Sequence, residues 1–209
     1  MENKKDWTGG SRSTYSILAA SSHSDTKREI NDYYATNPRM AEELLKFLPQ
    51  LNNIWEPACG EGHLAKIFEK YNKLKLASDL IDRGYHSSTC GKDFDFLNLD
   101  NSNNSKYNGD IVTNPPYKYA LKFVEKALSI IESGRYVCMF LKIQFLEGKS
   151  RRILYDKEPP KYILVSTNRV ECAKNGKPIS ENWTASAVCF AWFIWQKDYK
   201  GDTIIKWFN

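Results

Sequence analysis

The residues whose types and spacing could do chemistry are Asn114-Pro115-Pro116-Tyr117, directly after the apolar run Asp110–Thr113. The side-chain oxygen of Asn114 and the carbonyl of Pro115 can each accept a hydrogen bond from one N–H of a substrate amino group. An exocyclic amine on a heteroaromatic ring is a weak nucleophile because its lone pair is delocalised into the ring. Two acceptors pull its nitrogen toward tetrahedral geometry and localise that lone pair.

Consecutive prolines restrict the backbone of this run, so both acceptors are positioned before a substrate arrives. Tyr117 can stack on a base, as aromatic pockets do for an extruded nucleotide. The run therefore predicts a catalytic site that acts on an amino nitrogen. Taken alone, it also fits a stiffened strand exit in which Tyr117 only packs.

A second cluster, Glu56–His63, lies between a predicted strand and a predicted helix. Gly60 and Gly62 permit a tight turn and let a ligand approach the backbone. By itself the turn also fits a dinucleotide fingerprint, or a turn without a ligand. Glu56 at the strand end disfavours a pyrophosphate and suits a cationic amino-acid group.

Acidic residues continue this pattern along the chain. Asp79, at the end of the next predicted strand, can accept hydrogen bonds from two ribose hydroxyls. Asp95 offers a carboxylate for an adenine amino group, and Phe96 a ring for the purine. Asp79 as a helix cap and Phe96 as plain core are the simpler explanations. In this order, together with Glu56, the set predicts S-adenosylmethionine as cofactor and direct in-line methyl transfer without a metal.

Alternating strand and helix patterns place both clusters at one edge of a sheet. Within the strand predicted over 136–143, Lys142 interrupts an otherwise apolar run, as in a central strand covered on both faces. The β-rich runs 187–195 and 203–208 predict an antiparallel hairpin at one edge. The sequence thus predicts an α/β protein with a Rossmann-like methyltransferase fold. The remaining strands are predicted at 53–56, 74–79 and 110–113, and the helices after Asn37-Pro38, around 64–71 and over 119–132.

Length and composition set further limits. The 209 residues fit one domain, which we expect over 31–209 after a flexible tail at 1–30. Five scattered cysteines and three histidines offer no zinc-ligand spacing, so no metal is expected. No apolar run suits a membrane span, which predicts a cytoplasmic protein. The net charge of +5 is compatible with a polyanionic partner.

These residues resemble the N6-adenine DNA methyltransferase family, in particular its small phage-type members, from about Tyr33 to the C-terminus. Asn114–Tyr117 is similar to the family's catalytic motif, and Asn114 also borders its cofactor. The resemblance implies S-adenosylmethionine as cofactor and DNA with a flipped adenine as partner. The implied cofactor contacts are Tyr34, Thr36, Glu56, Pro57, Ala58, Gly60, Gly62, Asp79, Asp95 and Phe96.

The chain departs from the family in having no long extra segment for target recognition. Two stretches, 147–160 and 171–184, are the candidate recognition loops. Their cations can hold phosphates and their tryptophan can stack or wedge, although solvated loops explain them equally well. Short loops predict a short or relaxed recognition sequence, or a partner protein. The candidate residues are Lys149, Arg151, Arg152, Lys174, Lys177 and Trp183.

Several alternatives share the same chemistry. Adenine N6 in RNA, cytosine N4 and the side-chain amide of a protein glutamine are also planar, weakly nucleophilic NH₂ groups. The Ser-rich start of the chain, in place of a helical substrate-binding domain, argues against glutamine. Methylation of cytosine C5 needs a nucleophilic cysteine, which usually follows a proline, and none does here. A non-catalytic nucleic-acid-binding module stays open as a different class.

Overall fold

The computed structural model describes residues 34–87, 90–91, 93–100, 105–170, 172–174 and 188–208. The predicted tail at 1–30 lies outside the described residues, as do Lys177 and Trp183.

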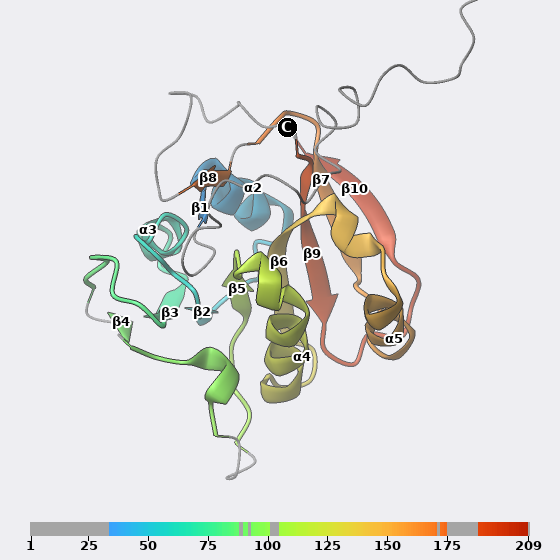
Figure 1. The fold of residues 1–209 in the computed structure, drawn as a ribbon, viewed down its shortest axis with the longest axis horizontal. Coiled ribbons are helices and arrows are strands. Elements are labelled where there is room, and N and C mark those ends of the chain that lie inside the picture. Colours follow the sequence, from blue (N-terminus) through green and yellow to red (C-terminus); the bar gives the residue numbers. More distant parts are fainter. Residues whose placement is uncertain are drawn as a thin grey trace, which may run out of the picture.

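An eight-stranded sheet forms the centre of the molecule, in the order β10-β7-β9-β6-β5-β2-β3-β4 (Figure 1). Strand β9 is antiparallel to both of its neighbours, and the other pairs are parallel. The sheet is therefore mostly parallel, as predicted. The strands are β2 (Ile54–Glu56), β3 (Leu74–Ser78), β4 (Cys90–Gly91), β5 (Ile111–Thr113), β6 (Tyr136–Lys142), β7 (Tyr162–Ser166), β9 (Phe190–Gln196) and β10 (Ile204–Phe208).

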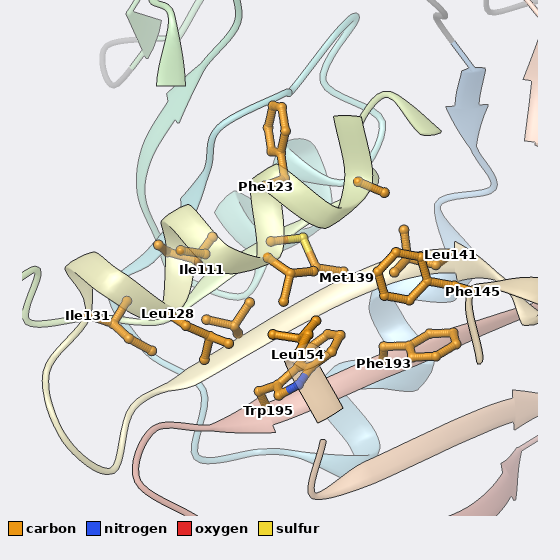
Figure 2. Packing of buried hydrophobic residues seen from close by; sticks show 14 of the residues in the cluster. Ile111, Phe123, Leu128, Ile131, Met139, Leu141, Phe145, Leu154, Phe193 and Trp195 are labelled. Carbon is orange, nitrogen blue, oxygen red and sulfur yellow. The ribbon is translucent and has the colours of Figure 1, made fainter. Parts of the chain in front are cut away.

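Alternate residues of the strands supply two apolar layers, one on each face of the sheet. One layer joins residues of α2 and α3 to Val112, Phe140 and Trp192. The other, drawn in Figure 2, joins residues of α4 and α5 to Met139 and Phe193. Helices thus cover both faces and fix the strand ends in place. The helices are α2 (Arg39–Phe47), α3 (Ala65–Lys70), α4 (Ala120–Ile130) and α5 (Lys149–Lys157), with 3₁₀ turns η1 (Phe96–Asn98), η2 (Tyr117–Tyr119) and η3 (Ile143–Leu146).

The C-terminal strands differ from the prediction in one respect. Strand β9 is antiparallel, as expected, but it does not pair with β10. Strand β7, which the sequence analysis had left out, lies between them, and β10 runs parallel to it. The buried residues Ile163 and Leu164 of β7 explain this order. They are covered only if β7 is an inner strand, whereas a β9–β10 hairpin would leave it at the edge.

The prediction of a loop over 147–160 is wrong as well, because most of this segment forms α5. This helix buries Leu154 against the sheet layer that contains Met139. Apolar contact is limited to Leu154 and the half-buried Tyr155 among charged residues, which explains why the segment resembles a solvated loop in sequence.

A separate two-stranded antiparallel sheet joins β1 (Tyr34–Thr36) to β8 (Cys172–Lys174). Figure 1 shows this small sheet beside α2 and α3, close to the ends of the central strands. It holds Tyr34 and Thr36, which contact the end of β5 through Asn114. The segment that precedes α2 is thereby brought to the carboxyl ends of the strands in the main sheet.

Candidate active site

A cavity of about 710 Å³ lies at the carboxyl ends of β2, β3 and β5. Crevices at this edge are where parallel α/β sheets bind ligands. Most of the predicted cofactor and catalytic residues line it together, although they come from segments far apart in the sequence. Those that do are Tyr34, Thr36, Glu56, Pro57, Ala58, Asp79, Asp95, Phe96, Asn114, Pro115 and Pro116.

Asn114 directly follows β5, and its amide group is held in one orientation. Its Nδ2 donates hydrogen bonds to the Tyr34 carbonyl at 3.0 Å and to Thr36 Oγ1 at 2.8 Å. A backbone carbonyl can only accept, so the NH₂ side of the amide must face it. Asn114 Oδ1 is buried and has no hydrogen-bond partner among the described residues. An unsatisfied buried acceptor is costly, and an incoming N–H would remove that cost.

The remainder of the Asn114–Tyr117 run leaves the strand in an extended conformation. Pro116 has φ −54° and ψ 120°, and η2 begins immediately after it. Tyr117 is not among the cavity-lining residues. Its ring lies 5.4 Å from the Tyr34 ring and 6.0 Å from the Phe190 ring, between centroids. The ammonium of Lys142 lies 4.8 Å from the centroid of the Tyr117 ring.

Glu56 ends β2 and is 2% exposed. Burial raises the pKa of its carboxyl well above 4.5, the negative charge of Asp79 raises the pKa further, and the Ala65 N–H lowers it. Glu56 Oε2 has no hydrogen-bond partner among the described residues. A buried acid with one oxygen left without a partner at a cavity wall suits a cationic ligand group, which would hold the acid ionised.

The glycine turn is tied to the end of β3. Gly60 has φ 55° and Gly62 φ 77°, which are left-handed values that favour glycine. The Gly60 N–H donates to Asp79 Oδ2 at 2.8 Å. A Cβ at Gly62 would overlap the ring of Tyr85. Neither glycine is among the cavity-lining residues, so the two shape the turn that carries Ala58 and Cys59 to the cavity.

Asp79 is engaged on both carboxylate oxygens. Oδ1 accepts hydrogen bonds from the Ile81 N–H at 3.0 Å and from Arg83 at 2.8 Å, while Oδ2 accepts the Gly60 N–H. The ion pair with Arg83 is mostly buried. Arg83 also lines the cavity, and the sequence analysis missed it. Because three accepting positions are taken, two ribose hydroxyls could bind Asp79 only if these bonds rearranged.

The predicted adenine contacts lie side by side but have structural roles of their own. Asp95 caps η1, its Oδ1 accepting from the Leu97 and Asn98 N–H groups. Phe96 is 2% exposed and packs edge-on against Trp55 at 5.3 Å between ring centroids. Phe94 also lines the cavity.

One face of α4 and the turn before it supply cavity-lining residues that the sequence analysis missed. They lie at helical spacing inside the helix predicted over 119–132, so assigning the face of that helix nearest the catalytic run to the site would have found them. They are Tyr119, Lys122, Phe123, Glu125, Lys126 and Ser129.

The predicted phosphate-binding cations are not gathered at the cavity. Lys149, Arg151 and Arg152 belong to the first half of α5, and none lines it. Arg152 pairs with Asp156 at 2.6 Å, and the Arg151 guanidinium lies 5.2 Å from the Phe145 ring centroid. The backbone of Lys174 pairs with Tyr34 in the small sheet.

Among the described residues, no group of three His, Cys, Asp or Glu side chains could hold a metal ion. In the same part of the chain, no helix is both long enough and apolar enough to cross a membrane.

The sequence matches no family model and no curated protein. Its fold is nevertheless shared with solved structures of low sequence identity. A candidate hemolysin from Lactococcus lactis is 12% identical, with a TM-score of 0.54 over 81% of this chain and 92% of that one. A candidate class I S-adenosylmethionine-dependent methyltransferase from Listeria monocytogenes is 15% identical, with a TM-score of 0.52 over 81% and 62%. The M protein of the type I restriction enzyme EcoKI is 13% identical, with a TM-score of 0.54 over 82% and 45%.

The chain spans less than two thirds of the last two proteins. Together with the strand order, these likenesses confirm the predicted Rossmann-like methyltransferase fold. At such identities they show the fold alone, and the activity must be argued from the site.

Proposed function

We propose that this protein transfers a methyl group from S-adenosylmethionine to the exocyclic N6 of adenine in DNA. The observation that carries the proposal is the amide of Asn114. Its NH₂ side is fixed by Tyr34 and Thr36, and its buried oxygen lacks a partner among the described residues. An acceptor kept in this way suits an N–H donor on the substrate.

The cavity residues fit the cofactor. When bound, S-adenosylmethionine supplies a methyl sulfonium as the electrophile. Glu56, whose Oε2 is buried without a partner, would hold the ammonium of the methionine part. Asp79 and Asp95 would serve the ribose and adenine, and Phe94 or Phe96 would contact the purine.

The catalytic run acts on the nucleophile. Asn114 Oδ1 and the Pro115 carbonyl would each accept one N–H of the adenine amine and localise its lone pair on nitrogen. The N–C bond would form in line as the C–S bond of the cofactor breaks, S-adenosylhomocysteine would leave as a neutral thioether, and the amine would release one proton to water. Tyr117 would stack on the flipped base. Most of the rate enhancement then comes from positioning and preorganised acceptors.

Two observations support DNA as the substrate polymer. The net charge of +5 suits a polyanion, and the M protein of a DNA restriction enzyme has the same fold. RNA adenines and protein glutamine amides offer the same kind of nitrogen and are the alternatives to be tested. The alternative of a different class is a protein of this fold that binds nucleic acid but catalyses no reaction.

Labelled S-adenosylmethionine with DNA, RNA and protein as acceptors separates these possibilities. We expect label in DNA adenine, and its loss in Asn114→Ala with cofactor affinity, measured by calorimetry, largely kept. Asn52→Ala is the matched control and should keep full activity, because the exposed Asn52 precedes β2 and so lies at the end of the strands opposite the cavity. Label in protein alone would contradict the proposed substrate. If no acceptor is labelled and calorimetry shows no cofactor binding, the proposal that the protein is a methyltransferase is contradicted.

A further inference from the structure

Lys142 is a cation placed beside the catalytic run, and nothing in the chemistry described above uses it. It is the last residue of β6, whose other residues are apolar or aromatic. Since Thr113 of β5 pairs with Met139 of β6, the end of β6 extends along the Asn114–Tyr117 run. The side chain is half-buried, and its ammonium lies 4.8 Å from the centroid of the Tyr117 ring.

The ammonium of Lys142 has no carboxylate partner among the described residues. The other half-buried cations of the described part of the chain each have an oxygen partner. Arg83 and Lys197 pair with the carboxylates of Asp79 and Glu158. The rest donate to carbonyl or amide oxygens, and they are Lys73, Lys126, Arg135, Arg151 and Lys161. The ring of Tyr117 compensates for only part of the lost hydration, since a cation–π contact is worth less than a desolvated ion pair. A cation kept half-buried in this way suits an anion that arrives from outside the chain.

The charge of Lys142 also opposes the reaction unless it is neutralised. As the lone pair of the amine attacks, the single positive charge of the sulfonium moves onto the nitrogen. A second positive charge close to the Asn114–Tyr117 run raises the energy of that transition state. An anion on the substrate, bound to Lys142, would remove this penalty. A neutral amide substrate would not.

The carboxylates and Lys142 occupy different parts of the site. Glu56, Asp79 and Asp95 line the part of the cavity formed by the ends of β2, β3 and η1. Lys142 lies next to the Tyr117 ring instead. Lys118, the residue after Tyr117, has its ammonium 5.3 Å from the centroid of the Tyr119 ring. The cavity is therefore lined by both signs of charge, since Arg83, Lys122 and Lys126 line it as well, whereas Lys142 and Lys118 are not among its lining residues.

We propose that Lys142 binds a backbone phosphate next to the target nucleotide and thereby selects nucleic acid over a neutral protein amide. This inference rests on the proposed function and names a substrate-positioning residue for it. The contact would hold the flipped base against Tyr117 and neutralise the cation at the same time.

The test compares Lys142→Gln, which removes the charge, with Lys142→Arg, which keeps it. Lys200→Gln is the matched control, because the exposed Lys200 follows β9, whose end pairs with the start of β6, far from Lys142 at the end of β6. Binding of a fluorescent adenine-containing oligonucleotide is measured by anisotropy from about 50 to about 200 mM NaCl. Methyl transfer is followed on the same oligonucleotide, and cofactor affinity by calorimetry.

We expect Lys142→Gln to reduce the slope of log affinity against log salt by about 0.7 to 0.9, the value of one phosphate contact. Oligonucleotide affinity should fall about fivefold at low salt. KM for the oligonucleotide should rise while cofactor affinity stays unchanged. Lys142→Arg and Lys200→Gln should keep the wild-type slope.

An unchanged slope and affinity in Lys142→Gln would overturn the inference, even if the wild-type protein methylates DNA. If the wild-type protein methylates nothing, the proposed function fails, and the salt slope still decides whether Lys142 contacts phosphate. A loss of binding that leaves the slope unchanged would indicate a packing role and would also overturn the inference.

Discussion

Thr36 Oγ1 accepts a hydrogen bond from Asn114 Nδ2 at 2.8 Å, which joins the small β1–β8 sheet to the end of β5. The two residues are 78 positions apart in the chain. Together with the Tyr34 carbonyl, Thr36 keeps the Asn114 amide from turning over. The accepting oxygen is therefore fixed by a segment that precedes α2.

We expect Thr36→Val to slow methyl transfer by about five- to tenfold, because one hydrogen bond of about 1 kcal/mol holds the amide less tightly. The effect should appear in the single-turnover rate. Thr36→Ser retains the hydroxyl and is the matched control, expected within about twofold of wild type. Equal rates for the Val and Ser variants would show that Tyr34 alone orients Asn114.

The parts of the site that end regular strands could be predicted from the sequence. Glu56, Asp79 and Asn114 each follow an apolar strand, and parallel strands bring their carboxyl ends to one edge. Arg83 could not be predicted in this way. Its position depends on how the loop after β3 packs against the sheet, and no short-range pattern records that.

The pairing of the last strands was wrong for a related physical reason. Two β-rich runs close in sequence favour a hairpin, because local pairing costs little loop entropy. Strand β7 competes for the same partner, β9, and buries Ile163 and Leu164 when it is placed inside. Burial of this apolar surface outweighs the local preference, and it depends on residues about 30 positions away.

Glu56 predicts a pH dependence of stability. Burial raises its pKa well above 4.5, so the folded chain holds this proton more tightly than the unfolded chain. The stabilisation that comes from protonated Glu56 is complete below the pKa that this carboxyl has in the unfolded chain. It is lost as pH rises through the pKa that the carboxyl has in the folded chain. Glu56→Gln should therefore raise the melting temperature of the cofactor-free protein at about pH 8 and change it less at about pH 5.

Cofactor binding should respond to Glu56→Gln in the opposite direction. The variant cannot pair with the ammonium of S-adenosylmethionine, and its affinity in calorimetry should fall by at least about tenfold. Thermal melts at both pH values with and without cofactor separate the two effects. A variant that is less stable at high pH, or that binds cofactor as wild type does, would refute the assignment of Glu56.

Gly62 predicts a second stability effect, which a matched glycine can isolate. Gly62 and Gly84 both have left-handed φ values, 77° and 85°. A Cβ at Gly84 meets nothing within 4 Å, whereas one at Gly62 overlaps the Tyr85 ring. Gly84→Ala should cost about 1 kcal/mol of backbone strain. Gly62→Ala should cost about 2 to 4 kcal/mol in urea unfolding and weaken cofactor binding as well.

Equal destabilisation by the two glycine variants would mean that the Tyr85 ring moves aside without cost. The double variant Gly62→Ala, Tyr85→Ala checks this directly. If overlap is the cause, removing the ring should make the Gly62→Ala change cost about as much as the change at Gly84.

Asp110 predicts a further loss of stability outside the cavity. It precedes β5 and is 2% exposed. Its carboxylate accepts the Asn52 N–H at 2.7 Å and the Tyr136 N–H at 2.8 Å, which joins the chain entering β5 to the segments that enter β2 and β6. Burial raises the pKa of this carboxyl, and the two N–H groups partly offset the rise. Asp110→Ala would leave two backbone donors without their acceptor.

We expect Asp110→Ala to lower the free energy of unfolding by about 3 kcal/mol, since hydrogen bonds to a charged group are worth about 1.5 to 3 kcal/mol each. Asp110→Asn should cost nearly as much, because its amide has one accepting oxygen and turns an NH₂ toward the other donor. Urea unfolding measures both, and the exposed Asp202→Ala serves as control, with an expected change below about 0.5 kcal/mol. An Asp110→Asn variant as stable as wild type would show that one of the two hydrogen bonds is enough to align the three strands beneath the catalytic run.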